Sequence, residues 1–419
     1  IAGDSAVVVG RDGRISGPSI ASALMDGICA SGCNTVDIGM VPTPFTYFSS
    51  HELGIGSAVS VTGSHNPPDY NGLKVMIVTH TLAAERIQAL RERIATQDFS
   101  KGTGKRQSHD IVPAYIDRVV GDIRLDRPLR IVTDCGNGVA GMAAPRLLRD
   151  IGCEVSELFS EVDGNFPNHH PDPSVAKNLA SLIDTVQREN ADLGLAFDGD
   201  GDRLGVVSGT GQIIWPDRQM ILFAKDILSR NPGAQIVYDV KCSRLLPRAI
   251  EQAGGRPLMW KTGHSFIKGK IRETGAALGG EMSGHLFFKE RWYGFDDAIY
   301  AAARLCELLS RRSESPNEVF SQIPDTVNTP ELRLEMNEGE HHQLILELVA
   351  QGKFEGGQTC KIDGIRVDFD DGFGLARASN TTPTVILRFE ADTQEGLERI
   401  QACYREQILA IRPKIQLPF

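Results

Sequence analysis

A strand–helix–strand pattern that occurs three times along the chain most strongly limits what the protein can fold into. In each unit two small residues, the first of them glycine, lie between the helical pattern and the second apolar run; the pairs are Gly32-Cys33, Gly152-Cys153 and Gly254-Gly255. Glycine can adopt the positive φ that ends a helix without a steric penalty. Alternating strands and helices are typical of α/β folds, and the three glycines lie 120 and 102 residues apart. We therefore expect three similar α/β domains in tandem.

Each unit predicts two strands with one helix between them. The expected elements are strand Ala6–Gly10, helix Pro18–Ser31 and strand Asn34–Gly39; strand Arg130–Asp134, helix Val139–Asp150 and strand Glu154–Phe159; strand Gln235–Asp239, helix Ser243–Ala253 and strand Arg256–Lys261. We expect Ser16 or Ser19 to cap the first helix, and Pro18 suits the first turn of that helix.

The last part of the chain has a different pattern. After a polar, proline-containing stretch come three short apolar runs and one helical segment, which are Leu332–Met336, Ile365–Phe369, Thr384–Glu390 and Gln394–Ile411. This order predicts a smaller C-terminal α+β domain. The expected domains are therefore residues 1–105, 106–211, 212–323 and 324–419.

Composition excludes several classes of protein. Lys plus Arg is 44 and Asp plus Glu is 54, so the net charge of −10 argues against partners such as nucleic acid or an anionic membrane. No apolar run approaches the roughly 18 residues that a membrane span needs. The start at Ile1 has no pattern of a targeting segment. Eight cysteines without a CxxC pair favour a reducing, cytoplasmic location.

A candidate nucleophile lies in Thr62-Gly63-Ser64-His65-Asn66-Pro67-Pro68, directly after the apolar run Ser57–Val61. A serine in a tight loop at a strand end is exposed and rigidly held, but its hydroxyl needs a base, a metal or an attached phosphoryl group. Side chains that are neighbours on an extended backbone point apart, so we expect His65 to contact a ligand rather than to deprotonate Ser64. Spacing alone fits a plain Asn-Pro turn with hydrogen-bonding loop residues somewhat better.

A candidate metal site is Asp198-Gly199-Asp200-Gly201-Asp202-Arg203, which follows the apolar run Leu193–Phe197. Three carboxylates at alternate positions can direct their oxygens at one hard cation, and without a cation they would raise one another's pKa. An EF-hand would need Gly where Arg203 stands and Glu where Gly209 stands. Mg²⁺ is the metal we expect, and a solvated acidic turn is the alternative.

Two further loops carry ligand-binding residue types. In Gly279-Gly280-Glu281-Met282-Ser283-Gly284-His285, the Glu and Ser face one side and could hold sugar hydroxyls, while the His could act as an acid or base. In Arg377-Ala378-Ser379-Asn380-Thr381-Thr382-Pro383, a guanidinium, hydroxyls and loop N–H groups could hold an anion. A glycine-rich turn and a polar loop without a ligand are the respective alternatives.

Other motifs are interpreted as structural. The run from Gly136 to Gly141 matches GxGxxG, but no second feature of a dinucleotide site accompanies it, so strand-to-helix packing is expected. His169-His170 is expected to be structural, and Lys268, Lys270 and Arg272 are expected on a solvated face. No G-x-S-x-G surrounds Ser64 or Ser283, which argues against an α/β-hydrolase.

The four candidate segments, in this order, resemble the α-D-phosphohexomutase superfamily and, within it, the bacterial phosphomannomutase/phosphoglucomutase group. The resemblance runs through the whole chain, and four motifs in register are more specific than any one. It implies four domains around a central cleft, which carry in order the phosphoserine, the metal, the sugar-binding and the phosphate-binding residues. Family members usually begin with a segment containing Tyr-Asp-Ile-Arg-Gly, and from its absence before Ile1 we expect a truncated N-terminus.

The resemblance also implies roles for single residues. Ser64 is expected to carry the phosphoryl group, and Mg²⁺ is expected to be bound by Asp198, Asp200, Asp202 and a phosphoserine oxygen. The expected substrate-binding residues are Arg203, Lys241, His264, Glu281, Ser283, Arg377, Ser379, Asn380 and Thr381. The expected active-site groups that could move a proton are Lys74, in Asn71-Gly72-Leu73-Lys74, His65 and His285.

The function that follows is reversible conversion of hexose 1-phosphate and hexose 6-phosphate of mannose or glucose, through a hexose 1,6-bisphosphate. Glucose 1,6-bisphosphate is the expected activator, phosphosugars are the expected partners, and the chain is expected to be a cytoplasmic monomer or weak homodimer. A phosphoglucosamine mutase, a Mg²⁺-dependent sugar phosphatase and an inactive sugar-phosphate binder are the alternatives.

Overall fold

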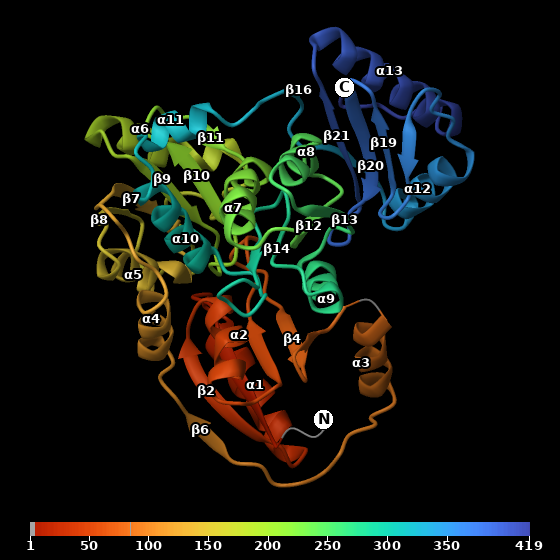
Figure 1. Cartoon of the computed structure of the whole chain (residues 1–419). Helices are drawn as coiled ribbons and strands as arrows, with labels where there is room; N and C mark the ends of the chain where they lie inside the picture. Colours follow the sequence, from red (N-terminus) through yellow and green to blue (C-terminus); the bar gives the residue numbers. More distant parts are fainter. Residues whose placement is uncertain (1–4, 84) are drawn as a thin grey trace.

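The computed structural model describes residues 5–83 and 85–419, so the expectation about the start at Ile1 lies outside the described residues. The described chain forms four sheets in chain order, and we name the domain around each sheet domain 1 to domain 4. Figure 1 shows domain 1 in red and orange, domains 2 and 3 in yellow through green to teal beside each other, and domain 4 in blue. The expected architecture of three α/β domains and a C-terminal α+β domain is confirmed.

Domain 1 has a six-stranded sheet in the order β5-β4-β3-β1-β2-β6. Its elements are β1 (Ala6–Arg11), α1 (Gly17–Ala30), β2 (Asn34–Met40), α2 (Thr43–Glu52), β3 (Ala58–Val61), β4 (Leu73–Ile77), β5 (His80–Thr81), α3 (Glu85–Ala95) and β6 (Arg106–Ser108). β1 is parallel to β2 and β3, and β4 is antiparallel to β3. β6 pairs with β2, so the first sheet continues past the expected boundary at residue 105.

Domain 2 has a five-stranded sheet in the order β11-β10-β9-β7-β8. Its elements are α4 (Val112–Val120), β7 (Arg130–Asp134), a 3₁₀ turn (Val139–Met142), α5 (Ala144–Asp150), β8 (Glu154–Leu158), a second 3₁₀ turn (Ala176–Leu179), α6 (Ala180–Glu189), β9 (Leu193–Phe197), β10 (Leu204–Ser208) and β11 (Ile213–Ile214). The helix expected over residues 139–150 is divided, because Ala143 leaves the helical region at φ −134° and Pro145 starts a new helix.

Domain 3 has a four-stranded sheet in the order β13-β12-β14-β15. Its elements are α7 (Pro216–Arg230), β12 (Gln235–Asp239), α8 (Leu245–Gln252), β13 (Arg256–Trp260), α9 (His264–Thr274), β14 (Leu278–Gly280), β15 (Leu286–Phe288), α10 (Ala298–Ser310) and α11 (Pro316–Ser321). The glycines predicted to end the first helix of each repeated unit have the expected positive φ: 92° at Gly32, 105° at Gly152 and 79° at Gly254.

Domain 4 is a sheet in the order β16-β21-β20-β19-β18, with β17 also paired to β21, and two helices pack on it. Its elements are β16 (Val327–Asn328), β17 (Leu332–Glu335), α12 (Glu340–Gln351), β18 (Gln358–Cys360), β19 (Ile365–Phe369), β20 (Gly372–Ala378), β21 (Thr384–Ala391) and α13 (Gln394–Ile411). The predicted strand Ile365–Phe369 and helix Gln394–Ile411 are confirmed residue for residue.

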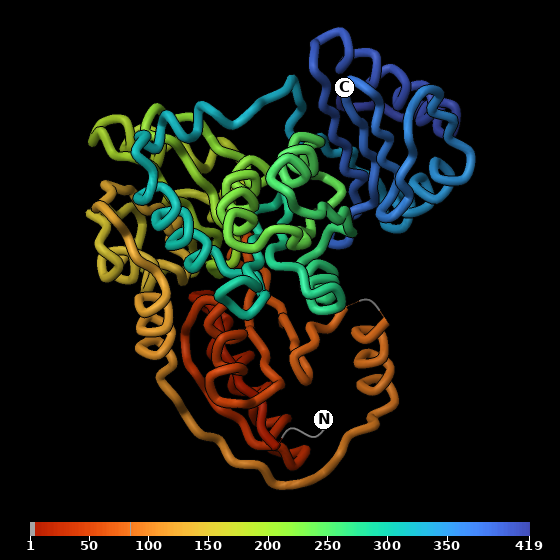
Figure 2. The backbone as a smooth tube through the Cα atoms, viewed as in Figure 1, coloured from red at the N-terminus to blue at the C-terminus, as the bar shows by residue number. Residues whose placement is uncertain are grey.

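The main apolar core of domain 4 is distinct from that of the other domains, and a small cluster of Val240, Phe373 and Leu375 lies between domains 3 and 4. One continuous cluster of buried apolar side chains runs through domains 1, 2 and 3, whereas domain 4 has a cluster of its own. Figure 2 shows the single stretch of backbone that leads from domain 3 into domain 4. At the junction of domains 1 to 3, the rings of Phe45 and Tyr115 stack with 3.7 Å between their centroids. The Tyr115 ring also contacts Trp292 edge-on at 5.8 Å. Domains 1 to 3 therefore share a core.

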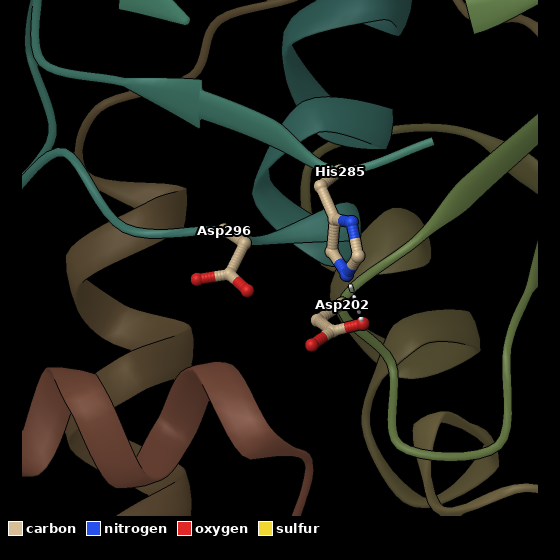
Figure 3. Close-up of side chains that lie close together, drawn as sticks. All are labelled: Asp202, His285 and Asp296. Atoms are coloured by element: carbon tan, nitrogen blue, oxygen red, sulfur yellow. Dashed lines mark ion pairs between the residues drawn. The ribbon is translucent and has the colours of Figure 1, made fainter. Parts of the chain in front are cut away.

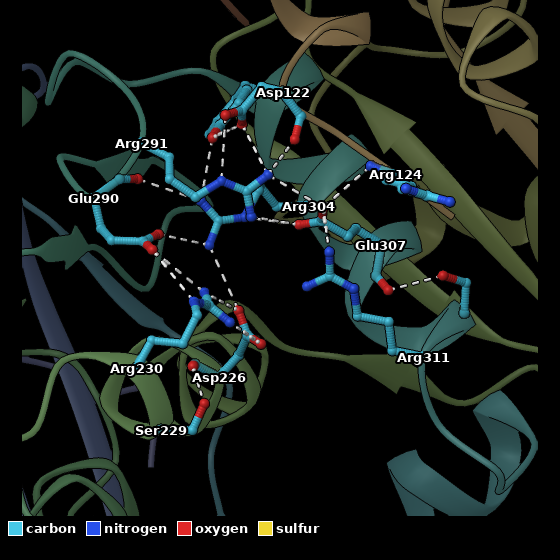
Figure 4. A network of polar contacts seen from close by, with 12 residues as sticks. Asp122, Arg124, Asp226, Ser229, Arg230, Glu290, Arg291, Arg304, Glu307 and Arg311 are labelled. Atoms are coloured by element: carbon cyan, nitrogen blue, oxygen red, sulfur yellow. Dashed lines mark hydrogen bonds and ion pairs between the residues drawn. The ribbon is translucent and has the colours of Figure 1, made fainter. Parts of the chain in front are cut away.

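A network of charged side chains reinforces the junction between domains 2 and 3 (Figure 4). At its centre the Arg304 side chain, 1% exposed, lies 2.8 Å from Glu290 and 3.6 Å from Glu307. Arg291 joins Glu307, at 2.8 Å, to Asp122 just after α4, at 3.1 Å. Because these buried charges are paired, the network holds the end of α4 against α10.

The expected cap of the first helix is corrected. Ser16 occupies the N-cap position of α1, but neither Ser16 nor Ser19 accepts a hydrogen bond from the helix N–H groups. Instead the Ser16 hydroxyl accepts from Asn71 at 2.9 Å, and the Ser19 hydroxyl donates to the Ser16 carbonyl at 2.9 Å. Among the described helices, none combines the length and apolar character that crossing a bilayer requires.

Candidate active site

The loop that carries Ser64 leaves β3 and turns sharply at the serine itself. Ser64 has φ 49°, in the left-handed region, and its N–H donates to the Thr62 hydroxyl at 2.8 Å. Its Oγ lies 3.0 Å from Oδ2 of Asp198 in domain 2. The expected meeting of this hydroxyl with the aspartate cluster is therefore confirmed. Ser64 is 9% exposed, so the expectation of an exposed serine is wrong, because domain 2 closes over the loop.

Arg14 shapes this loop, and sequence analysis did not single it out. The buried guanidinium donates to the carbonyl oxygens of Ser64 at 2.8 Å and Asn66 at 2.6 Å, and also to those of Pro67 and Tyr70. Asp12 holds the Arg14 Nε at 3.2 Å. A Cβ on Gly63 would lie 2.5 Å from Arg14, so glycine is needed where the loop passes over the guanidinium. The short run Asp12-Gly13-Arg14 gave no pattern that indicates this role.

His65 lies beside the serine rather than away from it. Its Nδ1 is 3.3 Å from the Ser64 Oγ, so the expectation that the two side chains point apart is wrong. The reason is the left-handed backbone at Ser64, because neighbouring side chains point apart only on an extended chain. Positive charge on Arg203, followed by burial, lowers the pKa of His65 to about 3. The imidazole is therefore neutral and a weak proton acceptor in this arrangement.

The three aspartates lie in the turn between β9 and β10, and all three are fully buried. One carboxylate oxygen from each lies within 4.8 Å of the others. Burial, then repulsion from Asp200 and Asp202, raises the pKa of Asp198 well above its usual value. Oδ1 of Asp200 is buried and has no hydrogen-bond partner within residues 5–83 and 85–419. An orphaned acceptor among converging carboxylates fits a hard divalent cation, and Mg²⁺ suits an all-oxygen donor set.

Lys74 offsets part of this negative charge. Antiparallel pairing of β3 and β4 places Lys74 opposite Ser60, next to the serine loop. Its ammonium contacts the carboxylates of Asp200, at 2.7 Å, and Asp202. Burial would lower the pKa of Lys74, but the two carboxylates outweigh it and raise the pKa well above its usual value. Lys74 is therefore a fixed cation between the serine loop and the aspartate turn.

The loop between β14 and β15 contacts the aspartate turn through His285. Nε2 of His285 is 3.2 Å from Asp202, and Nδ1 is 2.8 Å from Glu281 and 2.9 Å from the Ser283 hydroxyl. Burial opposes the charge on His285, but Asp202 and Glu281 raise its pKa to about 9. Nε of Arg203 lies 3.3 Å from Nε2 of the same ring. The predicted sugar-binding loop and metal-binding turn therefore form one connected polar site.

Asp296 and Lys268 complete this region, and sequence analysis missed both. Asp296 is fully buried, and its carboxylate lies 2.8 Å from the Lys268 ammonium and 3.3 Å from Nδ1 of His264 at the start of α9. Figure 3 shows Asp296 next to Asp202 and His285. The expected solvated face is therefore wrong for Lys268, which is buried. Helical periodicity alone could not show that one side of α9 faces a buried carboxylate.

The remaining predicted residues lie where domain 4 meets domain 3. Arg377 and the Ser379 hydroxyl are buried at the end of β20, and Ser379 accepts from the Thr381 N–H at 3.3 Å. Asn380 is exposed beside them. Lys241, after β12, pairs with Glu331 at 2.5 Å. The described contacts link Ser64, the aspartates, Lys74 and the β14–β15 loop directly, whereas Arg377 reaches the β14–β15 loop only through intermediate residues.

The GxGxxG run serves packing. A Cβ on Gly138 would lie 3.0 Å from Gly199, and a Cβ on Gly141 would lie 2.0 Å from the Ser160 carbonyl oxygen. The Val139 N–H donates to the Gly199 carbonyl at 3.1 Å. These glycines let the β7–α5 loop support the aspartate turn, as the packing interpretation expected.

Comparison with known families gives four matches in order along the chain. Residues 2–101, 113–211 and 215–327 match the α/β/α domains I, II and III of phosphoglucomutase/phosphomannomutase, and residues 331–407 match the C-terminal domain.

Individual relatives agree with this result. A phosphomannomutase/phosphoglucomutase of Pseudomonas aeruginosa is 54% identical over 417 residues, which is 100% of this chain and 90% of the relative. A phosphoglucomutase of Neisseria gonorrhoeae is 53% identical over 411 residues, 97% of this chain and 89% of that protein. A solved phosphoglucomutase/phosphomannomutase family protein from Burkholderia thailandensis has a TM-score of 0.95 and 53% identity, and the match covers 100% of this chain and 92% of the other.

Proposed function

The chain belongs to the phosphoglucomutase/phosphomannomutase family, and on that premise we propose how its own residues carry out the reaction. The protein is an intramolecular phosphotransferase that reversibly converts the 1-phosphates and 6-phosphates of mannose and glucose through an enzyme phosphoserine. We assign the phosphoserine to Ser64. The observation that supports this assignment is the 3.0 Å distance between its Oγ and the buried Asp198 carboxylate.

In the first step a hydroxyl oxygen of the hexose phosphate attacks the phosphorus on Ser64. The bond between phosphorus and Oγ breaks, a bond to the sugar oxygen forms, and the hydroxyl proton passes to the protein. The bisphosphate then turns end for end, and its other phosphate returns to Oγ. Because little covalent chemistry falls to other side chains, catalysis rests on positioning and on stabilising charge.

Asp198, Asp200 and Asp202 would hold Mg²⁺ together with an oxygen of the phosphoserine. Bound there, the cation offsets negative charge on the transferring group. The orphaned Oδ1 of Asp200 supports this role. Arg203 lies against His65 and His285 and supplies a further positive charge at the site.

Recognition of the sugar is assigned to Glu281, Ser283 and His264. Glu281 already accepts a hydrogen bond from the N–H of Gly263, next to His264, so the two loops are fixed relative to each other. We assign binding of the non-reacting phosphate to a buried lysine, a buried arginine and a hydroxyl-rich loop. These residues are Lys241, Arg377, Ser379, Asn380 and Thr381.

Three side chains near Oγ could transfer the hydroxyl proton: Lys74, His65 and His285. The low pKa of His65 makes it the weakest acceptor of the three. His285, with a pKa of about 9, is suited to return a proton when the sugar oxygen leaves, whereas the strongly raised pKa of Lys74 keeps its ammonium charged.

We further propose that glucose 1,6-bisphosphate activates the enzyme by loading Ser64. The proposed setting is the cytoplasm, with phosphosugars rather than nucleic acid or a membrane as partners, and the chain acts as a monomer or weak homodimer. The eight cysteines, all among the described residues, form no disulfide, and the net charge is −10, which supports this setting.

Peptide mass spectrometry after incubation with glucose 1,6-bisphosphate and Mg²⁺ tests the assignment. We expect about 80 Da on the peptide that contains Ser64, none in Ser64→Ala, and normal labelling in Ser19→Ala, an exposed control serine. Isomerisation should be largely lost in Ser64→Ala and after chelation with EDTA, and Mg²⁺ should restore it in the second case.

Wild-type turnover by Ser64→Ala would refute the phosphoserine role. Release of inorganic phosphate without isomerisation would instead indicate a sugar phosphatase, and a preference for glucosamine phosphates would indicate a phosphoglucosamine mutase.

A further inference from the structure

We propose that Asp363 is a positioning residue that aims Arg377 at the substrate phosphate. We also propose that it couples domain 4 to the β14–β15 loop of domain 3, which holds Glu281 and Ser283 and which we call the sugar-recognition loop. The proposal rests on the proposed function, in which Arg377 binds that phosphate.

One carboxylate oxygen of Asp363 serves both domains. Oδ2 accepts from Nε of Arg377 at 2.9 Å, within domain 4, and from the backbone N–H of Thr262 at 3.0 Å, in domain 3. Nη2 of Arg377 is buried and has no hydrogen-bond partner among the described residues. Fixing a guanidinium through Nε leaves its outer edge available, and that edge is suited to bidentate binding of a phosphate.

The turn that carries Asp363 presses against the backbone of Arg377. Gly364 has φ 75°, and a Cβ there would lie 2.3 Å from the Ala376 carbonyl oxygen and 2.7 Å from Cα of Arg377. Only glycine allows an approach this close at a positive φ. The carboxylate position relative to Arg377 is therefore set by backbone contact as well as by charge.

Hydrogen bonds of Thr262 and of the next residue, Gly263, reach the sugar-recognition loop. The Thr262 hydroxyl donates to Oδ2 of Asp239 at 2.9 Å, and Oδ1 of Asp239 accepts from the Met282 N–H at 3.2 Å. The next residue, Gly263, donates to the carboxylate of Glu281. Asp363 is therefore connected through two short paths to the loop that holds Glu281 and Ser283.

Other contacts hold domain 4 in place without Asp363. Arg366 donates to the carbonyl oxygens of Val240 and Cys242, both at 2.7 Å, and Arg388 pairs with Asp217 at 3.2 Å. Arg366 therefore holds the loop after β12, and Arg388 holds the start of α7. Loss of the Asp363 contact should therefore leave domain 4 folded and attached, and should change substrate binding.

The test compares Asp363→Ala and Asp363→Asn with Asp371→Asn, a control at an exposed ion pair of the same domain. Asparagine keeps an acceptor for the Thr262 N–H but removes the charge opposite Arg377. We expect KM for glucose 1-phosphate to rise at least about tenfold in Asp363→Ala, less in Asp363→Asn, and not in the control. The turnover number kcat should fall much less than KM rises, whereas a merely structural loss would lower both the active fraction and the melting temperature.

A double-mutant cycle decides whether Asp363 acts through Arg377. If it does, Asp363→Ala/Arg377→Ala should bind glucose 6-phosphate no more than about twofold more weakly than Arg377→Ala, when both are measured calorimetrically in a Ser64→Ala background. Additive losses, or an unchanged KM in Asp363→Ala, would overturn the proposal. Because this binding needs no phosphoryl transfer, its outcome is separate from phosphorylation of Ser64: failure to find phosphoserine removes the proposed function and leaves the binding result standing.

Discussion

At the level of single residues, the site is built around a serine in a left-handed conformation. A non-glycine residue at φ 49° costs about 1–3 kcal/mol and persists only where its surroundings fix it. The surroundings here are Arg14, which binds four carbonyl oxygens of the loop, and Thr62, which binds the Ser64 N–H. The strain places Oγ and His65 on the same side of the chain, toward Asp198.

Replacing Arg14 by lysine should therefore disturb both the loop and catalysis. One ammonium cannot reach four separated carbonyl oxygens, so buried acceptors would lose their partners. We expect a loss of about 2–3 kcal/mol in the free energy of unfolding and at least about tenfold in kcat. Urea unfolding and steady-state kinetics measure the two effects. Arg11→Lys, in the same strand region, serves as the control, and an equal response of both variants would contradict the role given to Arg14.

His169 gives a pH-dependent prediction outside the site. Burial would lower its pKa, but the hydrogen bond to Asp134 at 3.0 Å outweighs burial and raises it. A raised pKa in the folded state stabilises the fold below the unfolded pKa of about 6.5, and this contribution disappears as the pH rises through the folded pKa.

The difference in unfolding free energy between the wild type and His169→Asn should accordingly be larger at pH 5.5 than at pH 8.5. Because His169 is partly exposed, solvent screening should keep the pH-dependent part under about 1 kcal/mol. Unfolding titrations at the two pH values, with His80→Asn as an exposed control, check this. A difference that grows with pH would show that the sign is wrong.

Single-residue inferences from sequence succeeded where residue type alone restricts chemistry. The spacing of the three aspartates predicted that their carboxylates lie close together, because few arrangements other than a cation site tolerate so much negative charge in one place. Sequence could not show that the Ser64 and His65 side chains lie side by side, because this depends on the φ angle of Ser64. Arg14 and Lys268 were missed since their partners are backbone carbonyls and a carboxylate distant in sequence.

At the level of elements, the repeated units are where local sequence and tertiary structure agree. β7 and β12 begin and end where the apolar runs predicted. The helix α2 could not be recognised in the same way, because residues 43–50 are all buried and show no alternation of polar and apolar faces. One side of α2 packs on β1 and β3 of its own sheet, and the other is covered by two other domains, which no local pattern encodes.

Two glycines in different elements should respond in opposite ways to alanine. Gly141→Ala places a Cβ 2.0 Å from the Ser160 carbonyl oxygen, so we expect a loss of about 1–3 kcal/mol in unfolding free energy. Gly27→Ala, in α1, meets nothing within 4 Å and should gain about 0.5–1 kcal/mol from helix propensity. Thermal unfolding of the two variants is the measurement. Tolerance of alanine at Gly141 would contradict the packing interpretation of the GxGxxG run.

At the level of the whole molecule, the charge network between domains 2 and 3 should contribute strongly to stability. Arg304→Ala removes the buried positive charge that pairs with Glu290 and Glu307. We therefore expect the free energy of unfolding to fall by about 3–5 kcal/mol. Arg311→Ala removes a more exposed arginine from the same network and should cost under about 1 kcal/mol. Chemical denaturation measures the free energy of unfolding of both variants. Similar losses in the two would show that burial does not determine how much each arginine contributes to stability.

Sequence predicted the order of the domains but not how they share a core. Alternation of strands and helices repeats in each domain, so it is visible locally. The apolar cluster that unites domains 1 to 3 depends on side chains such as Phe45, Tyr115 and Trp292, which come from three domains and follow no common period. The proposed coupling by Asp363 was invisible for the same reason, since its partners lie in another domain and in a later strand.

The separate core of domain 4 affects what happens to the intermediate during a catalytic cycle. The serine, the aspartates and the sugar-recognition loop belong to the part of the molecule that shares one core. In the proposed mechanism we therefore expect them to stay assembled while the bisphosphate is released from Arg377 and rebinds. Whether the intermediate reorients before it diffuses away is then governed by the contacts of a single domain. Weakening those contacts should increase the dependence of steady-state turnover on added bisphosphate, and leave the rate of a single phosphoryl transfer unchanged.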